Sequence, residues 1–192
     1  MLKVMIVDNN HDRTKSLKQS LLDTGYEVIA HLKDTVNLEG ACCELQPDVV
    51  IIDTDSPSRD TLENLCVMSM HHPRPVVMFT HDGDKEKIKT ATQAGVSAYV
   101  VGTIPSERLT PVIDAAVARF EEFKHLRTEL AMAKTQLDER KIIERAKGLL
   151  MKQRNLDEEE AYGLLRSMAM KKNMKLADLS NQLIEAASML IV

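Results

Sequence analysis

Hydrophobic and polar positions follow two different patterns in the first and second parts of the chain. Up to about residue 104, short apolar segments rich in β-branched residues alternate with longer amphipathic ones. The apolar segments are too short for helices and are mostly apolar on both faces, so they predict strands of a sheet that is covered on both sides. Strands alternating with helices through short loops predict a doubly wound, five-stranded parallel α/β sheet. The predicted strands are 3–7, 26–30, 48–52, 75–79 and 97–101, and the predicted helices are 12–24, 35–45, 60–71 and 84–94.

From Pro105 onward the pattern is helical. A helix that begins near Ser106 can continue to about Met151, and part of it carries apolar residues spaced alternately three and four apart. This spacing is typical of the seam of a short coiled coil and predicts a homodimer. The alternative is that the stripe packs against its own chain. The seam consists of Phe123, Leu126, Leu130, Ala133 and Leu137.

Two shorter helices are expected after the long one. The pattern breaks at Asn155 and again at Asn173, and Asp157 is a suitable N-cap followed by three glutamates that favour the start of a helix. Together with the end of the long helix, these segments predict a three-helix bundle. The predicted domains are residues 1–105, a coiled-coil linker helix over 106–136, and residues 137–192.

Charge is distributed unevenly between these parts. Residues 140–175 hold ten Lys and Arg against five Asp and Glu, a net charge of +5, whereas the rest of the chain carries −9. A positive surface on an otherwise negative protein is typical of a module that binds a polyanion, because neutralising phosphates releases counterions. The alternative interpretation is a solvated helical bundle with ordinary bases on its outside.

The composition gives no indication of a membrane or secreted protein. No apolar run approaches the roughly 18 residues that span a bilayer. The N-terminus lacks the apolar core and the cleavage site of a signal peptide. The three cysteines are an odd number without metal-ligand or redox spacing. A cytoplasmic protein without a membrane partner is therefore expected.

Carboxylates end two of the predicted strands. Asp8 ends the first strand and Asp53 ends the third, and ligands of parallel α/β sheets bind at this edge. Two or three carboxylates in one place repel each other unless a hard cation is present, so they suggest a Mg²⁺ site. An aspartate held against Mg²⁺ can also act as a nucleophile toward a phosphoryl group.

The order of motifs resembles a response-regulator receiver domain. The motifs are VD at 7–8, DxDxP at 53–57, a threonine after PVVMF and the aromatic residue of AYVV. The resemblance implies that Asp53 is the phosphoacceptor, that Asp8 belongs to the acidic pair, and that the backbone carbonyl of Asp55 helps to bind the metal. It also implies that Thr80 and Tyr99 are the switch hydroxyl and the switch aromatic residue.

Two positions depart from the receiver pattern. The second member of the acidic pair is Asn9, a neutral amide, and the lysine expected after AYVV is replaced by Gly102. The loss of this lysine removes a cation that would pair with the phosphoacceptor and the phosphoryl oxygens. Inefficient phosphorylation of Asp53 is therefore expected, with the domain serving instead as a protein-binding scaffold.

The C-terminal sequence resembles the ANTAR domain, a three-helix RNA-binding module of bacterial antiterminators. The resemblance covers residues 137–190 through RKIIERAKGLLM (140–151), EEEAY (158–162), LLRSMAM (164–170) and the KLAD segment at 175–178. The combination of receiver, coiled coil and this module resembles the AmiR and NasT class of regulators. The segment 53–63 resembles the nitrate-assimilation branch of that class.

Bases, small residues and one methionine of this module are candidates for RNA contact. Arg140 and Lys147 are seven residues apart and share a helix face, and the small residue Gly148 lets a partner approach closely. Proteins recognise RNA loops by stacking side chains on splayed nucleobases and by placing Lys or Arg side chains on the phosphates. Tyr162, Met168 and Met170 are stacking candidates, with the alternative that they belong to the core. The predicted RNA-binding residues are Arg140, Arg145, Lys147, Gly148, Arg166, Met170, Lys171 and Lys172.

These features favour an RNA-binding antiterminator that acts as a dimer on hairpins of leader transcripts. The resemblance to the nitrate branch implies control by a ligand-sensing regulatory protein, and a histidine kinase is the other candidate partner. No catalytic residues are assigned, and the protein is expected not to be an enzyme. The alternatives are a DNA-binding response regulator and a receiver-type adaptor whose C-terminal bundle binds protein.

Overall fold

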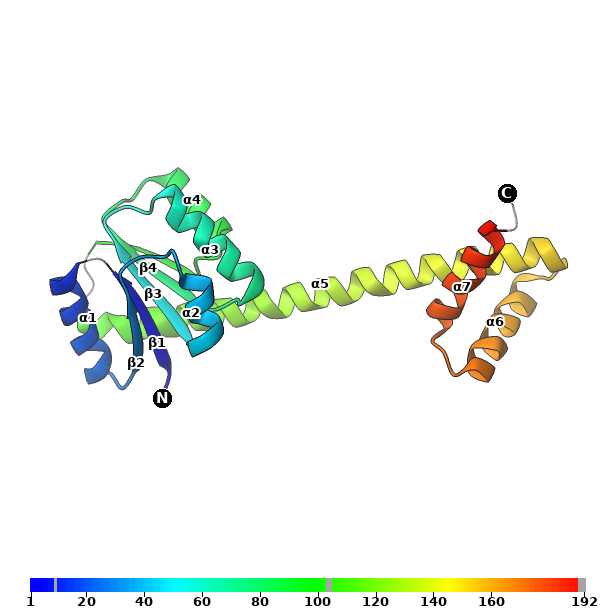
Figure 1. Cartoon of the computed structure of the whole chain (residues 1–192), viewed down its shortest axis with the longest axis horizontal. Coiled ribbons are helices and arrows are strands. Elements are labelled where there is room, and N and C mark those ends of the chain that lie inside the picture. The colour runs from blue at the N-terminus through cyan, green and yellow to red at the C-terminus, as the bar shows by residue number, and fades with distance from the viewer. Residues whose placement is uncertain (9, 103–104, 190–192) are drawn as a thin grey trace. The chain divides into compact units, whose positions relative to one another are not determined.

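The computed structural model describes residues 1–8, 10–102 and 105–189, and the chain forms two compact units, Met1–Lys124 and His125–Val192. The N-terminal unit alternates strands and helices as predicted, with ends shifted by no more than three residues (Figure 1). Its strands are β1 (Lys3–Asp8), β2 (Glu27–Leu32), β3 (Val49–Thr54), β4 (Val76–Thr80) and β5 (Ala98–Val101). Its helices are α1 (His11–Asp23), α2 (Leu38–Leu45), α3 (Arg59–His71), α4 (Lys85–Gln93) and the start of α5 (Ser106–Arg154).

All five strands are parallel, in the order β2-β1-β3-β4-β5. From β1 the chain first adds β2 on one side and then crosses over to add β3 on the other side of β1. The strand order therefore reverses between β1 and β3, and ligands of α/β sheets bind in the crevice at such a point. The register pairs Asp8 with Asp53. The two carboxylates predicted to meet at one sheet edge therefore do so.

Alternate residues of each strand face opposite sides of the sheet, and each side has its own core. Residues such as Met5, Val50 and Met78 pack beneath α2, α3 and α4. Ile6, Ile51 and Val77 face the other side, where they pack against α1 and the first turns of α5. The central strands β1, β3 and β4 are buried on both faces, which explains their uninterrupted apolar sequences.

The first turns of α5 belong to the N-terminal unit. Leu109, Ile113 and Ala116 are at most 3% exposed and complete the core on the α1 side of the sheet. The predicted domain boundary at residue 105 therefore falls inside this unit, because the helix after β5 supplies part of its core.

The C-terminal unit consists of the end of α5, α6 (Glu158–Lys172) and α7 (Leu176–Met189). Its small core contains Ala146 and Leu150 of α5, Leu165 of α6 and Leu179 of α7. This is the predicted three-helix bundle. No helix within the described ranges combines the length and the apolar character that crossing a membrane requires.

Local sequence fixes the ends of these helices. Asp157 and Glu160 form a reciprocal capping box at the start of α6. Asn155 and Asn173 have left-handed φ angles of 54° and 51°, a conformation that asparagine tolerates well, and they end α5 and α6. The predicted breaks at both asparagines are confirmed.

Candidate functional sites

Asp8 lies at the end of β1, and both of its carboxylate oxygens accept hydrogen bonds from the loop and helix that follow. It is 2% exposed. One carboxylate oxygen accepts a hydrogen bond from the Asn10 backbone nitrogen at 2.7 Å, and the other accepts from Thr14 Oγ1 at 2.9 Å. Asn9, the predicted neutral member of the acidic pair, lies outside the described residues.

Arg13 of α1 supplies a cation to this acidic edge. Its Nη1 donates to Asp55 Oδ1 at 2.8 Å and lies 3.6 Å from Asp53 Oδ1. Burial disfavours the charged guanidinium, but the carboxylates of Asp53 and Asp55 outweigh burial and raise the pKa of Arg13. Sequence analysis did not single out this arginine, although its position in the first turn of the helix that follows Asp8 could have suggested it.

Asp53, the predicted phosphoacceptor, ends β3 as expected. Its side chain is 17% exposed. Burial raises the pKa of its carboxyl group because the charged form loses hydration, and Arg13 only partly offsets this effect. Asp53 is therefore a partly buried carboxylate, and the attraction of Arg13 does not fully offset the cost of burying its charge.

Asp8, Asp53 and Asp55, the residues of the predicted Mg²⁺ site, lie close together, but Asp8 and Asp55 already have hydrogen-bond partners within the protein. The backbone carbonyl of Asp55, expected to bind the metal, already accepts hydrogen bonds from Thr80 Oγ1 at 2.9 Å and from the His81 backbone nitrogen at 3.2 Å. These two bonds use both acceptor positions of a carbonyl oxygen. Within the described ranges, no three Asp, Glu, His or Cys side chains are placed to hold an ion. The residues present thus fit an internal arginine better than a divalent cation.

The two predicted switch residues, Thr80 and Tyr99, each contact a loop at this edge of the sheet. Thr80 is buried, and its hydroxyl donates to Asp55 as described above. The Tyr99 hydroxyl donates to the Asp82 backbone carbonyl at 2.8 Å. The Asp82 carboxylate in turn pairs with Lys87 Nζ at 2.6 Å, and hydrogen bonds from Lys87 and Ser56 lower the pKa of Asp82. The structure therefore brings Asp8, Asp53, Asp55 and Thr80 together, whereas Tyr99 lies on β5 and its hydroxyl contacts the β4–α4 loop.

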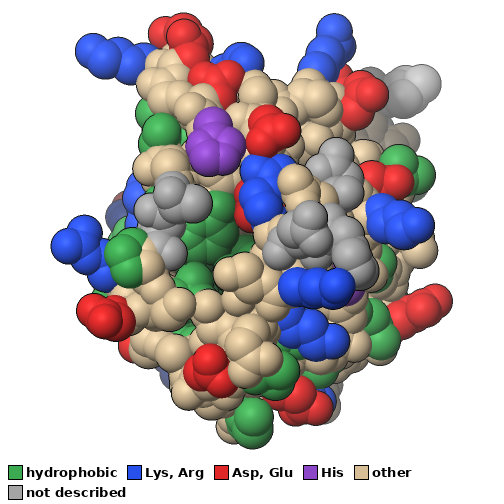
Figure 2. Space-filling model, turned by 90° about the vertical axis from the view of Figure 1, so that its left-hand side faces the viewer, with side chains coloured by type: hydrophobic (Ala, Val, Ile, Leu, Met, Phe, Trp, Pro, Cys, Tyr) green, Lys and Arg blue, Asp and Glu red, His purple; other side chains and the backbone are tan. Residues whose placement is uncertain are grey.

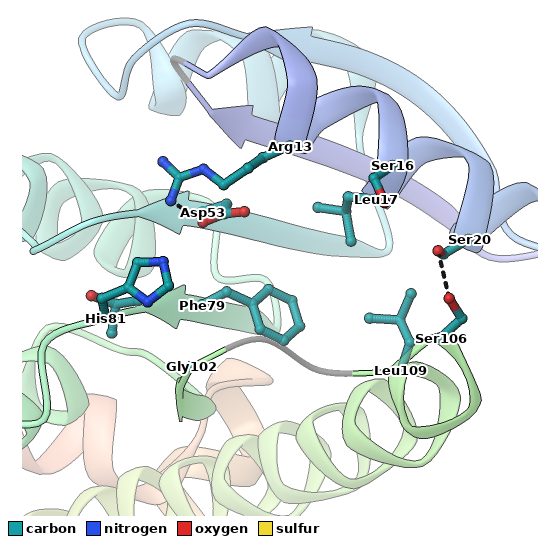
Figure 3. Close-up of a pocket in the computed structure, with 11 residues that line it drawn as sticks. Arg13, Ser16, Leu17, Ser20, Asp53, Phe79, His81, Gly102, Ser106 and Leu109 are labelled. Atoms are coloured by element: carbon teal, nitrogen blue, oxygen red, sulfur yellow. Dashed lines mark hydrogen bonds and ion pairs between the residues drawn. The ribbon is translucent and has the colours of Figure 1, made fainter.

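Gly102 leaves space where the receiver pattern has a lysine. Its φ is +88°, and nothing lies within 4 Å of the position that a Cβ would take. A pocket of about 170 Å³ opens beside it (Figure 3). Figure 2 shows a hollow in this side of the protein, with hydrophobic side chains at its floor and charged side chains at its rim. The pocket is lined by Arg13, Ser16, Leu17, Ser20, Asp53, Phe79, Thr80, His81, Gly102, Ser106 and Leu109.

Most of the predicted RNA-binding residues of the C-terminal unit face solvent. Met170 is 73% exposed, and Gly148, although partly buried, has nothing within 4 Å of its would-be Cβ. A partner could therefore approach the helix backbone at Gly148. The exposed bases among the predicted residues are Arg140, Arg145, Arg166, Lys171 and Lys172.

Lys147, another of the predicted RNA-binding residues, is an exception because its side chain does not face solvent. The side chain is 8% exposed, and Nζ lies 2.7 Å from both Glu144 Oε2 and Glu158 Oε1. These hydrogen bonds raise the pKa of Lys147. Lys147 thus ties α5 to the first residue of α6, because the turn at Asn155 brings Glu158 back over α5.

Tyr162, Arg166 and Met170 form one exposed stripe along α6. They are spaced four residues apart, which places them on one face of the helix. Tyr162 is 44% exposed, whereas Met168 packs partly against the core. The core alternative therefore holds in part for Met168, and Tyr162 and Met170 present an aromatic ring and a thioether to solvent on either side of a guanidinium.

The predicted coiled-coil seam lies on the exposed surface of α5 in the single chain. Phe123, Leu126, Leu130 and Leu137 are each between 52% and 60% exposed, and Ala133 is also exposed. Large apolar side chains at this spacing rarely remain in water. Among the described residues, Leu126, Leu130 and Leu137 are not members of the core of either unit.

Comparisons with known proteins agree with this division. Residues 4–114 match the response regulator receiver domain, and residues 131–184 match the ANTAR domain. The chain is 30% identical over 168 residues to the transcriptional regulatory protein PdtaR of Mycobacterium tuberculosis, covering 88% of this chain and 82% of that protein. It is 41% identical over 63 residues to the nitrate regulatory protein of Klebsiella oxytoca, covering 33% of this chain and 16% of that protein.

A solved structure supports the fold of the N-terminal unit. The signal receiver domain of a modulated diguanylate cyclase from Desulfovibrio desulfuricans G20 superimposes with a TM-score of 0.56 at 19% identity, covering 63% of this chain and 97% of that one. Receiver fold, ANTAR match and the near full-length similarity to PdtaR lead to one assignment. The chain belongs to the family of ANTAR-domain response regulators.

Proposed function

We propose that this regulator is an RNA-binding antiterminator whose C-terminal units bind hairpins in leader transcripts. The observation that carries the proposal is the exposed stripe of Tyr162, Arg166 and Met170, flanked by Lys171 and Lys172. Flat and polarisable side chains stack on unpaired nucleobases, and neighbouring Lys and Arg side chains neutralise phosphates. The loops of RNA hairpins present unpaired nucleobases and phosphates together.

A dimer is part of this proposal. Two copies joined through Phe123, Leu126, Leu130, Ala133 and Leu137 would remove the exposed apolar seam from water. Each dimer would then carry two stacking stripes, so a transcript with two adjacent hairpins would bind more tightly than one with a single hairpin.

The similarity to the nitrate regulatory protein supports transcripts of nitrogen-assimilation genes as targets. A ligand-sensing regulatory protein is the proposed gate, with a histidine kinase as the other candidate. The internal Arg13 and the engaged Asp55 carbonyl favour the sensor protein, because they leave little room for metal-dependent phosphorylation.

The test is a gel shift with the full chain at several salt concentrations. One probe is a two-hairpin leader RNA from a nitrogen-assimilation operon, and the other is duplex DNA of equal length. Preference for RNA, with an affinity that falls as salt rises, supports the proposal. Arg59→Ala is the charge-matched control, since Arg59 is an exposed base on α3 of the receiver unit.

Two other outcomes correspond to the alternative functions. Tighter binding to duplex DNA would indicate a DNA-binding regulator, although α7 carries no Lys or Arg that could enter a major groove. Binding to neither nucleic acid would favour the protein-binding adaptor. Either result would overturn the antiterminator proposal.

A further inference from the structure

The pocket beside Gly102 is an elongated slot with chemically different ends (Figure 3). Asp53, Arg13 and His81 lie at one end. The side chains of Leu17, Phe79 and Leu109 form apolar walls, and the other end is marked by the hydroxyls of Ser20 and Ser106, which hydrogen-bond to each other at 2.9 Å.

The backbone keeps this slot open. Gly102 has no side chain, and its φ of +88° lies in the region that L-residues rarely adopt. The chain therefore cannot readily fill the slot from this position with a side chain of its own. A cavity of roughly 150 Å³ accommodates a molecule of benzene size, so about 170 Å³ suits a ligand of similar size.

Charge at the polar end favours a cation. Asp8, Asp53 and Asp55 contribute three carboxylates, and Arg13 contributes one guanidinium, which leaves a formal excess of two negative charges when His81 is neutral. An anion placed there would be repelled by the uncompensated carboxylates. A second positive charge would relieve the repulsion.

Asp53 is the carboxylate with acceptor capacity to spare. Arg13 Nη1 lies 3.6 Å away, beyond hydrogen-bond distance. No other described residue donates a hydrogen bond to the Asp53 carboxylate, whereas both oxygens of Asp8 accept one. Among the described residues that line the slot, Asp53 is also the single one with a carboxylate side chain.

We propose that this slot binds a small primary alkylammonium ion. The ammonium group pairs with the Asp53 carboxylate, and the alkyl chain lies between Leu17, Phe79 and Leu109. The serine pair at the far end limits the chain length and can hydrogen-bond a terminal hydroxyl. Ligand binding on the receiver unit is independent of the proposed RNA binding, so either can fail without the other.

Three probes of equal length and different charge test this proposal on the full chain: n-butylammonium chloride, sodium n-butyrate and n-butanol at constant ionic strength. A ligand that binds the folded state raises Tm with concentration. The expected result is a Tm increase with n-butylammonium, at millimolar affinity for so small a ligand, and no increase with n-butyrate. Amide NMR shifts should concentrate at Leu17, Gly102 and Ser106.

Variants locate the site. Asp53→Asn should weaken n-butylammonium binding at least tenfold, whereas Asp60→Asn removes an exposed carboxylate of α3 outside the slot and should leave binding unchanged. Ser16→Phe places a ring at the lining of the slot and should block binding while Asp53 stays in place.

Equal Tm increases with all three probes would show that the slot does not select charge, and stronger binding of n-butyrate would show that it selects anions. Undiminished n-butylammonium binding in folded Asp53→Asn would place the site elsewhere. Each of these results, or the absence of binding at tens of millimolar, overturns the proposal.

Discussion

The Lys and Arg side chains of the two units differ in their partners. In the receiver unit, bases near the sheet edge are bonded to the protein itself, as Arg13 is to Asp55 and Lys87 to Asp82. In the C-terminal unit, Arg145, Arg166 and most other bases face solvent. A base that already has an internal partner must break that ion pair before it can bind a phosphate, whereas a solvated base need not. The difference supports the proposal that the C-terminal unit is the one that binds a polyanion.

Lys147 shows that a lysine in the basic segment 140–175 does not necessarily face solvent. It lies among the exposed bases in sequence but is held between Glu144 and Glu158 in space, as Arg13 is held among aspartates. Whether a Lys or Arg side chain is available to a phosphate therefore depends on its partners within the protein and not on the unit in which it occurs.

The largest effect is expected at the apolar seam. Leu130→Asp places a charge in the centre of the proposed dimer interface and should dissociate the dimer, because burying an unpaired carboxylate is far more costly than leaving it in water. Sedimentation at micromolar concentration measures the change. Lys134→Asp, also on the exposed surface of α5 but outside the seam, is the control. A wild type that stays monomeric would remove the coiled coil from the proposal.

Arg166→Ala tests the outward-facing bases. Loss of the central guanidinium of the α6 stripe should cost roughly 1–3 kcal/mol of hairpin binding if it stacks on or hydrogen-bonds an unpaired base. The bundle should remain folded because Arg166 is exposed. Binding is measured beside circular dichroism, with Arg59→Ala as the control. Unchanged affinity in a folded variant would move the RNA surface away from this stripe.

Lys147→Ala tests the inward-facing exception. The variant should lower the Tm of the C-terminal unit by roughly 5 °C, because α5 loses its ion pair to Glu158 and a buried alkyl stem. Lys147→Met keeps the stem and separates packing from charge. At temperatures where the variant is folded, the salt slope of RNA binding should match that of the wild type. A reduced slope with unchanged Tm would return Lys147 to the RNA surface.

The fold could be predicted from local sequence. β-Branched apolar segments of five residues have few alternatives to buried strands, and the αL-tolerant Asn155 and Asn173 end helices for local reasons. Asp8 and Asp53 could be placed together because parallel strands end at the same edge. These inferences depend on periodicity and on short-range backbone chemistry.

The remaining features of the sites depend on contacts that periodicity does not encode. Arg13 meets Asp55 across 42 residues, and Lys147 meets Glu158 only because α6 turns back over α5. Seven-residue spacing predicted that Lys147 and Arg140 share a helix face, but it could not show that carboxylates surround Lys147 while Arg140 faces solvent. The pocket beside Gly102 likewise arises from α1, β4 and α5 together.

The smallest effect is expected from Asp53→Asn, and its pH dependence measures how well Arg13 compensates the acidic edge. Burial raises the pKa of Asp53 above its usual value of 3.8, so the folded state binds this proton more tightly than the unfolded state does. The group therefore favours folding below pH 3.8 and loses that contribution as pH rises through its raised folded pKa. Asparagine carries no such penalty.

Asp53→Asn should accordingly be more stable than the wild type at pH 7, by roughly 0.5 kcal/mol or about 1–2 °C in Tm, and the difference should shrink toward pH 3. Thermal unfolding at several pH values measures this difference. Asp60→Asn is the control, because it removes an exposed carboxylate outside the slot and should not reproduce the gain in Tm at pH 7. The opposite trend, in which the wild type gains on the variant as pH rises, would mean that the Arg13 guanidinium outweighs burial at Asp53. The acidic edge would then be fully compensated, and the receiver unit would have no charge left to offer a cation.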